Sequence, residues 1–309
     1  MLEMPAHGFQ RSIKVHRVKL GVLVDWIEAS VVFADDSLSR SDVVDVLCEN
    51  EIYEDQTFAY ECVSDAWIEM NRRQKSVGQG SQFDVNGKVI KRLHEWNENV
   101  AYSFCMLLAS QPIWKAWSKT FGTDFTEQGL LFEELTAESL EYFGWDVLRA
   151  GWAPGNAAKI EKVVHEVSSH VGEPVVPDAI KEWLSDNAND EQLDVVCLDP
   201  YYDGFGGRPI YLFQCASGGN WPSKIQTPDP VTWGRIIGFS TPPQRGFAIP
   251  FGLMPEDFRK RAGRVQGVFL DRFRLQSPAY EGDVNWLSNA LEQKIRRWMK
   301  PRVKTLPVV

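Results

Sequence analysis

The sequence contains no pair of cysteines spaced as C-x-x-C and no long apolar run. The five cysteines are odd in number and scattered along the chain, which predicts neither a structural zinc site nor a disulfide framework. The most apolar stretches are far shorter than the roughly 20 residues that a membrane span needs. The sequence does not begin with a charged segment followed by an apolar run, so it predicts no signal peptide. We therefore expect a cytoplasmic protein that has no membrane contact.

Histidine pairs at metal-ligand spacing are also missing. Only His165 and His170 are close in sequence, and five residues apart is a poor spacing for one helical face. The glycine-rich segment Asp203-Gly-Phe-Gly-Gly-Arg208 has no following Lys-Ser/Thr and precedes no helix. It therefore predicts a hairpin loop and not a phosphate loop.

Charge is distributed unevenly along the 309 residues. The formal net charge is -9, yet the chain from Arg245 onward has 13 Lys/Arg against 6 Asp/Glu. An acidic protein is not a general binder of polyanions, since its overall field repels phosphate. The basic residues of this region either contact phosphates or form ordinary solvated helix faces; they are Arg259, Lys260, Arg261, Arg264, Arg296, Arg297, Lys300, Arg302 and Lys304.

Residues 1–122 predict a mainly helical accessory domain. A strand-like segment from Val15 to Leu23 opens it, and a serine of Ser39-Arg40-Ser41-Asp42 is the expected N-cap of the helix that follows. Longer helices are expected from Asp55 to Lys75 and from Trp96 to Ser110. Nothing in this part has the spacing of a catalytic or metal-binding cluster.

Residues 123–309 have a different pattern. They predict the order helix, strand, strand, strand, helix, strand, over Thr126–Phe143, Trp145–Trp152, Leu193–Leu198, Pro209–Ala216, Val231–Phe239 and Gly246–Phe251. A helix from Glu256 to Arg264, a strand from Gly267 to Leu275 and a helix from Val284 to Lys300 follow. This order predicts an α/β fold with a mixed central sheet flanked by helices.

Three polar residues in this second part interrupt apolar patterns. Glu133 shares a helical face with Leu130, Ala137 and Leu140, where a carboxylate is costly unless a cation, a proton or a metal meets it. A salt bridge to Arg149 or to a nearby lysine is the alternative to a metal.

Asp194 and Gln214 belong to two strands that can pair as a hairpin. Asp194 opens an apolar strand, and Gln214 is the polar residue of the run from Ile210 to Ala216. Their side-chain oxygens, with the Cys215 carbonyl and waters, could complete an octahedral oxygen shell suited to Mg²⁺.

These residues carry a resemblance to a known family. Gly129-Leu-Leu-Phe132-Glu133-Glu-Leu135 is similar to the Gly-x-x-Phe-Glu-x-Leu helix of PD-(D/E)XK restriction-endonuclease-like proteins. Asp194, a Gly-bearing loop and Gln214 resemble their Asp…(Glu/Gln)-x-Lys strands, in the Gln variant of the branch that includes type IV restriction endonucleases. Gln214-Cys-Ala-Ser-Gly-Gly-Asn-Trp221 resembles a signature of bacterial proteins associated with phage defence. The resemblance covers roughly residues 123–275, and residues 1–120 resemble the helical leader of the same group.

The resemblance implies a nuclease that cleaves DNA phosphodiester bonds with Mg²⁺ or Mn²⁺. Glu133, Asp194, Gln214 and the Cys215 carbonyl would form its metal site. Its partners would be DNA and other defence proteins, the latter bound through the acidic helical domain. The oligomeric state stays open, a homo-oligomer included.

One residue departs from the family pattern. Ala216 stands where the family's lysine is expected, two residues after the Gln. In the family this lysine assists the attacking water and stabilises developing charge. Lys224 is the first candidate for a migrated lysine, and Lys159 and Lys162 come after it. The alternative is a fold that has lost catalysis and serves as a nucleic-acid-binding or assembly subunit.

Overall fold

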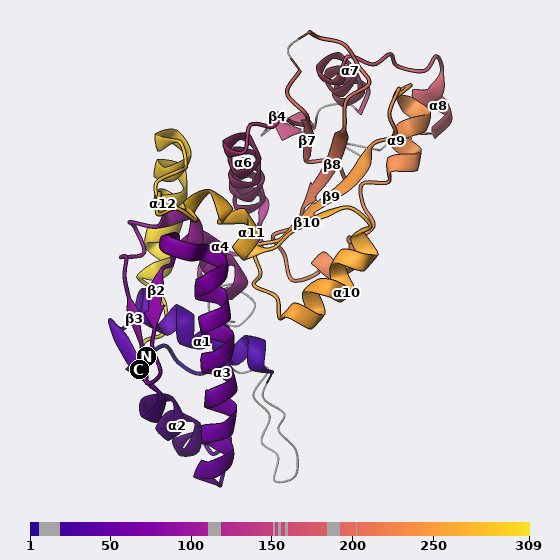
Figure 1. Ribbon diagram of the computed structural model, residues 1–309. Helices are drawn as coiled ribbons and strands as arrows, with labels where there is room; N and C mark the ends of the chain where they lie inside the picture. Colours follow the sequence, from indigo (N-terminus) through magenta and orange to yellow (C-terminus); the bar gives the residue numbers. More distant parts are fainter. Residues whose placement is uncertain are drawn as a thin grey trace. The chain divides into compact units, whose positions relative to one another are not determined.

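The computed structural model divides the chain into two compact units (Figure 1). It describes residues 1–5, 19–110, 119–150, 152–153, 156–157, 160–183, 192–201 and 203–309. The first unit comprises Met1–Phe125, Pro250–Met254 and Asp271–Val309, and the second comprises Thr126–Ile249 and Pro255–Leu270. The expected domain boundary between residues 122 and 123 lies close to the boundary between the two units, which falls between Phe125 and Thr126. The expected second domain ran to residue 309, whereas the last 39 residues belong to the first unit.

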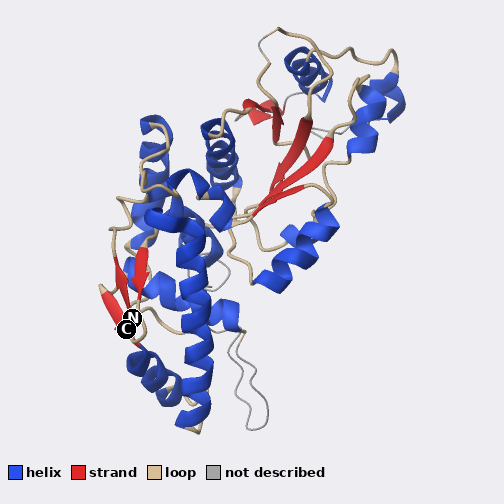
Figure 2. Cartoon of the chain, viewed as in Figure 1, coloured by secondary structure: helices blue, strands red, loops and turns tan. Residues whose placement is uncertain are grey.

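The first unit is mainly helical, with one small antiparallel sheet of order β1-β3-β2 (Figure 2). Its elements are α1 (Leu20–Phe33), β1 (Ser37–Ser39), α2 (Arg40–Glu49), α3 (Gln56–Val77), β2 (Phe83–Val85), β3 (Val89–Arg92), α4 (Val100–Ser110), α11 (Arg272–Leu275) and α12 (Asn289–Val303). Ser39 caps α2 as expected: its hydroxyl accepts from the Asp42 N–H, and the Asp42 carboxylate accepts from the Ser39 N–H. None of the described helices is both long and apolar enough to cross a membrane.

The strand expected from Val15 to Leu23 is wrong in its described part. Residues 15–18 lie outside the described residues, and Leu20 begins α1. This helix is buried over most of its length, with Leu23, Val24 and Ile27 fully enclosed. A helix that is apolar nearly all round lacks the 3.6-residue alternation, so a short apolar run cannot be told from a buried strand.

A buried ionic cluster joins three helices of the first unit. Asp25 and Glu28 come from α1, Arg73 from α3 and Arg272 from α11. Arg73 Nη1 lies 2.7 Å from Asp25 Oδ1 and 3.1 Å from Glu28 Oε2, and Arg272 Nη2 lies 2.8 and 3.2 Å from the same two atoms. The side chains of Glu28, Arg73 and Arg272 are 0% exposed. The cluster fixes the start of the carboxy-terminal segment to the first unit.

Removing one arginine of this cluster should destabilise the first unit strongly. Arg272→Met keeps much of the side-chain volume but leaves Asp25 and Glu28 as a buried pair of carboxylates with one guanidinium. We expect the free energy of unfolding to fall by about 3–5 kcal/mol. Denaturant titration measures it, and Arg274→Met is the control because Arg274 is exposed on the same helix. Equal stability of both variants would contradict this role of the cluster.

The second unit is built on a five-stranded mixed sheet of order β10-β9-β8-β7-β4. Its strands are β4 (Asp146–Arg149), β7 (Val195–Leu198), β8 (Ile210–Cys215), β9 (Gln244–Ala248) and β10 (Val268–Leu270). Strands β4, β7 and β8 are antiparallel to one another in turn, whereas β8, β9 and β10 run parallel. The helices are α6 (Thr126–Tyr142), α7 (Ile160–Val171), α8 (Ala179–Trp183), α9 (Pro230–Ile236) and α10 (Pro255–Val265), with a small hairpin of β5 (Trp152–Ala153) and β6 (Asn156–Ala157). The expected α/β fold with a mixed sheet is confirmed.

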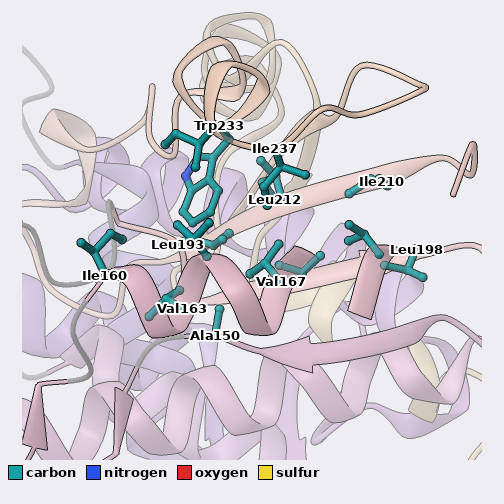
Figure 3. Packing of buried hydrophobic residues seen from close by; sticks show 14 residues of the cluster. Ala150, Ile160, Val163, Val167, Leu193, Leu198, Ile210, Leu212, Trp233 and Ile237 are labelled. Atoms are coloured by element: carbon teal, nitrogen blue, oxygen red, sulfur yellow. The ribbon is translucent and has the colours of Figure 1, made fainter. Parts of the chain in front are cut away.

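One face of this sheet is covered by α7 and α9 (Figure 3). Val163 and Val167 of α7 belong to one buried apolar cluster with Leu212 of β8 and Trp233 of α9. The strand residues that take part, among them Val196 and Leu212, alternate with residues that face the other way. Gln214 has the same parity as Leu212 within β8, so it begins on this face, at the end of the strand.

A buried carboxylate secures the loops next to this core. Glu173 is 6% exposed, and Oε1 accepts from the backbone N–H groups of Gly207 and Ser240, both at 2.9 Å. Oε2 accepts from the Ser240 hydroxyl at 3.0 Å. Burial acts to raise the pKa of Glu173, but the hydrogen bonds from Ser240 and Gly207 together lower it below its ordinary value.

Loss of this carboxylate should reduce stability in a pH-dependent way. The lowered pKa means that the contribution of Glu173 is present above its ordinary pKa and is lost as the pH falls through the lowered value. We expect Glu173→Ala to lower the free energy of unfolding by about 2 kcal/mol at neutral pH. The difference from the parent should shrink in acid. Thermal unfolding across pH measures it, with the exposed Glu182→Ala as control; a pH-independent difference would contradict the argument.

Candidate metal centre

The carboxylate of Asp194 lies at the end of the sheet, where β8 extends past the start of β7. The Asp194 N–H donates to the Phe213 carbonyl at 2.9 Å, so its backbone is still part of the sheet. Its Oδ2 accepts from the Cys215 N–H at 2.6 Å. Because the N–H groups of a strand lie in the plane of the sheet, this carboxylate lies close to that plane and not deep on either face.

Gln214 stands opposite Asp194 and holds it from the side. Its Nε2 donates to Asp194 Oδ2 at 2.6 Å, and its Oε1 accepts from the Thr227 hydroxyl at 3.3 Å. Asp194 is 8% exposed and Gln214 is 5% exposed. Both ends of the amide are therefore engaged. This is an orienting contact with Asp194, and the role of Gln214 as a metal ligand stays a prediction.

Glu133 approaches the same strand end from α6. Thr136, one turn further along α6, hydrogen-bonds the Cys215 thiol, so this helix covers the face toward which Cys215 points. Burial raises the pKa of the Cys215 thiol well above its usual value, and the negative charges of Asp194 and then Glu133 raise it further.

The salt bridge weighed as an alternative for Glu133 also exists, in a weak form. Arg149 Nη2 lies 4.0 Å from Glu133 Oε2, while Arg149 Nη1 lies 3.5 Å from Glu134 Oε2. The Arg149 side chain is 37% exposed and that of Glu133 is 16% exposed. A shared, partly solvated guanidinium at this distance contributes little to stability.

The lysine expected two residues after Gln214 is replaced by an alanine at the end of the central strand β8. Ala216 is 4% exposed, and its N–H donates to the Ala248 carbonyl at 2.9 Å. Lys224 follows in the next loop, and its carbonyl accepts from the Thr227 hydroxyl at 2.6 Å. Its side chain forms no ion pair with another described residue, so its catalytic role stays a prediction.

The two other lysine candidates are not brought to the site by the structure. Lys162 is exposed on α7, where its ammonium lies 3.7 Å from Glu166 Oε1. This is an ordinary i, i+4 surface pair. Lys159 lies outside the described residues.

Two threonines of the site were not found from the sequence. Thr227 fixes the amide of Gln214, and Thr136 contacts the Cys215 thiol. Thr227 precedes Pro228, which restricts its backbone to extended conformations. That signal marks a fixed residue but does not indicate what its hydroxyl binds. Thr136 has no local signal, because its partner is 79 residues away in the chain.

The donor set suits magnesium in kind. Glu133 and Asp194 offer the hard carboxylate oxygens that Mg²⁺ prefers. Within the described part of the chain, no three His, Cys, Asp or Glu side chains form a metal-binding group. Magnesium commonly uses one or two carboxylates, several waters and the phosphates of a substrate, so a group of three side chains is not required.

Comparisons with known proteins give no assignment: no family model, no curated protein and no solved structure matches the chain.

The contact between Gln214 and Asp194 can be tested through stability. Gln214→Leu has nearly the same shape but removes a donor from a buried carboxylate. We expect the free energy of unfolding to fall by about 1–3 kcal/mol. Denaturant titration measures the decrease, and Gln226→Leu, at an exposed position of the following loop, is the matched control. A Gln214 variant as stable as the parent would show that Asp194 does not depend on this amide.

Proposed function

We propose that the second unit is a restriction-endonuclease-like nuclease domain that hydrolyses DNA phosphodiester bonds with Mg²⁺ or Mn²⁺. The observation that carries the proposal is the buried Asp194 carboxylate at the end of the sheet, which Gln214 and the Cys215 N–H hold in one orientation. The helix α6, which carries Glu133, packs against the same strand β8. Two carboxylates on a rigid strand end and a helix are the kind of arrangement that binds a catalytic Mg²⁺.

The order of elements supports the proposal. The helix α6, the strands β4, β7 and β8, the helix α9 and the strand β9 follow one another in the order over which the family resemblance runs. The antiparallel strands β4, β7 and β8 are followed by the parallel β9, and the hairpin β5–β6 with α7 and α8 is inserted after β4. A role in defence against phage is proposed from the sequence resemblance alone.

Each residue of the proposed site would have a separate role in catalysis. Glu133 and Asp194 would hold the metal ion, which when bound acts as a Lewis acid on the phosphate and activates a water. Gln214 and the Cys215 N–H keep the Asp194 carboxylate in one orientation. Lys224 is carried by the loop that Thr227 fastens to Gln214, so a cation on that loop can approach the developing negative charge.

Ala216 favours a second candidate function. A buried methyl group stands at the position where the family pattern has an amine, and its backbone is fixed in the sheet. A protein of this fold without that amine could bind nucleic acid, or join a larger assembly, without cutting. This candidate differs from the first in catalysis and not in fold.

Cleavage assays separate the two candidates. Supercoiled plasmid and duplex oligonucleotides are incubated with Mg²⁺ or Mn²⁺, and the parent should cut them. Asp194→Asn and Glu133→Gln remove one negative charge each at nearly constant shape, and each should lower the cleavage rate by about 100-fold or more. Circular dichroism verifies that the variants are folded.

The matched control is Glu127→Gln, an exposed residue in the first turn of the same helix α6, which should cut at the parental rate. Unchanged cleavage by both the Asp194 and Glu133 variants would refute the proposed metal centre. A folded parent that binds DNA but cuts none with either metal would support the binding subunit.

A further inference from the structure

The helix α10 (Pro255–Val265) carries a concentrated positive charge. Its acidic residues, Glu256 and Asp257, are confined to the first turn, where they favour the helix dipole. The rest of the helix has only basic charges, from Arg259, Lys260, Arg261 and Arg264. In a chain whose net charge is -9, a helix segment of one sign is a local departure from the overall field.

Three of these cations face solvent. Arg259, Lys260 and Arg264 are exposed, and none of them forms an ion pair with another described residue. Lys260 and Arg264 are four residues apart, so they project from the same face at a spacing of about 5–6 Å. Glu256 lies four residues before Lys260 at the start of the helix, and beyond this first turn the exposed face carries cations alone.

The opposite side of α10 is fixed by aromatic packing. Phe258 stacks on Phe269 of β10 with ring centroids 5.1 Å apart, and Phe269 stacks on Trp221 at 6.3 Å. The Arg261 guanidinium lies 5.1 Å from the centre of the Trp221 ring. Figure 1 shows α10 beside β9 and β10 in this unit. The cationic face is therefore held in place against the sheet.

The packing of Trp221 links α10 to the candidate metal centre. Trp221 and Lys224 belong to one turn, since the Lys224 N–H donates to the Trp221 carbonyl at 3.0 Å. The Thr227 hydroxyl donates to the Lys224 carbonyl and contacts Gln214 Oε1. One loop, running from the end of β8 to α9, thus contacts the carboxylate-orienting amide at one point and a cation of α10 at another.

A second contact fastens the same loop to the end of α10. Arg245 Nε donates to the Pro228 carbonyl at 2.9 Å, and its Nη1 donates to the Val265 carbonyl at 3.0 Å. The loop that carries Lys224 is therefore connected to α10 at both of its ends. A linear polymer bound along α10 would therefore lie next to the loop that carries Lys224.

We infer that the exposed cationic face of α10 binds the phosphate backbone of duplex DNA and holds it beside the Asp194 site. The choice of DNA rests on the proposed nuclease function. Duplex DNA carries one negative charge per about 3.4 Å of axis on each strand, so successive phosphates can meet Arg259, Lys260 and Arg264 without reading sequence. Counterions released from the phosphates supply the free energy of binding, and the binding should weaken as salt rises.

The experiment measures DNA binding separately from cleavage. Fluorescence polarisation of a labelled short duplex is recorded over a range of salt, with Asp194→Asn as the background so that the duplex stays intact. Adding Arg259→Gln, Lys260→Gln and Arg264→Gln should weaken binding roughly tenfold or more near physiological salt. The slope of log K against log salt should become shallower by about 0.9 for each phosphate that the protein no longer neutralises.

The matched control changes the net charge equally at another place. Arg297→Gln, Lys300→Gln and Lys304→Gln remove three exposed cations from the region of α12 in the first unit. This variant should keep the parental affinity and slope. An equal decrease of binding in both triple variants, or no decrease in the α10 variant, would overturn the inference. Tighter binding of poly-glutamate than of duplex at equal charge would also overturn it, since the face would then fit an acidic protein.

Cleavage by the parent chain distinguishes this inference from the function on which it rests. If the parent cuts DNA, and the three α10 substitutions change neither binding in the Asp194→Asn background nor cleavage in the parent chain, the nuclease stands and the α10 surface is refuted. If the parent cuts nothing but the α10 variant binds DNA more weakly, the surface is supported and the nuclease is refuted.

Discussion

The second unit depends on one carboxylate at the point where two strands stop running together. Strand β8 continues past the start of β7, so the N–H of Cys215 has no residue of β7 left to bind. Asp194 supplies the missing acceptor from its side chain, and Gln214 fixes the same oxygen from the next position. A buried backbone N–H without a partner is costly, so the fold itself requires an acceptor here. The proposed site uses a group that the sheet already needs.

The need for an acceptor in the sheet and the proposed role as a metal ligand together restrict which residue can stand at position 194. A residue that only closed the sheet could be any acceptor, and a residue that only bound a metal could stand on any loop. A carboxylate that did both would have to be short, charged and placed where β7 begins. Burial raises the pKa of the neighbouring Cys215 thiol, and the negative charges of Asp194 and Glu133 raise it further.

Much of the second unit could be predicted from local sequence. The alternation of Leu212, Gln214 and Ala216 predicts the strand, and the polar residues on it predict the pairing of Asp194 with Gln214 across the hairpin. The hydroxyl of Thr227 was not predictable, because its partner is set by how a loop returns to the strand. The same reason applies to Thr136, whose contact depends on the packing of α6. Local periodicity says that a face is apolar or polar but not what meets it.

In the first unit, local sequence likewise predicts a helix but not the unit against which that helix packs. The helix α12 is expected from its pattern, yet its assignment to the second domain follows chain order alone. In the structure Trp298 of α12 packs edge-on against Phe104 of α4, with ring centroids 5.3 Å apart. The segment Val15–Leu23 resembles a strand in sequence because an enclosed helix such as α1 shows no polar face to reveal its period.

The two ends of the chain meet within the first unit. Leu2 and Val308 form an antiparallel bridge, and the N–H of Val309 donates to the carbonyl of Met1 at 2.9 Å. During synthesis the second unit has all its residues once Leu270 has left the ribosome, while the first, although begun earlier, still lacks α11 and α12. Domains usually become complete in amino-to-carboxy order during synthesis, whereas here the second unit is complete before the first. Apolar surface of the helices α1, α3 and α4 therefore stays uncovered until α11 and α12 have been synthesised.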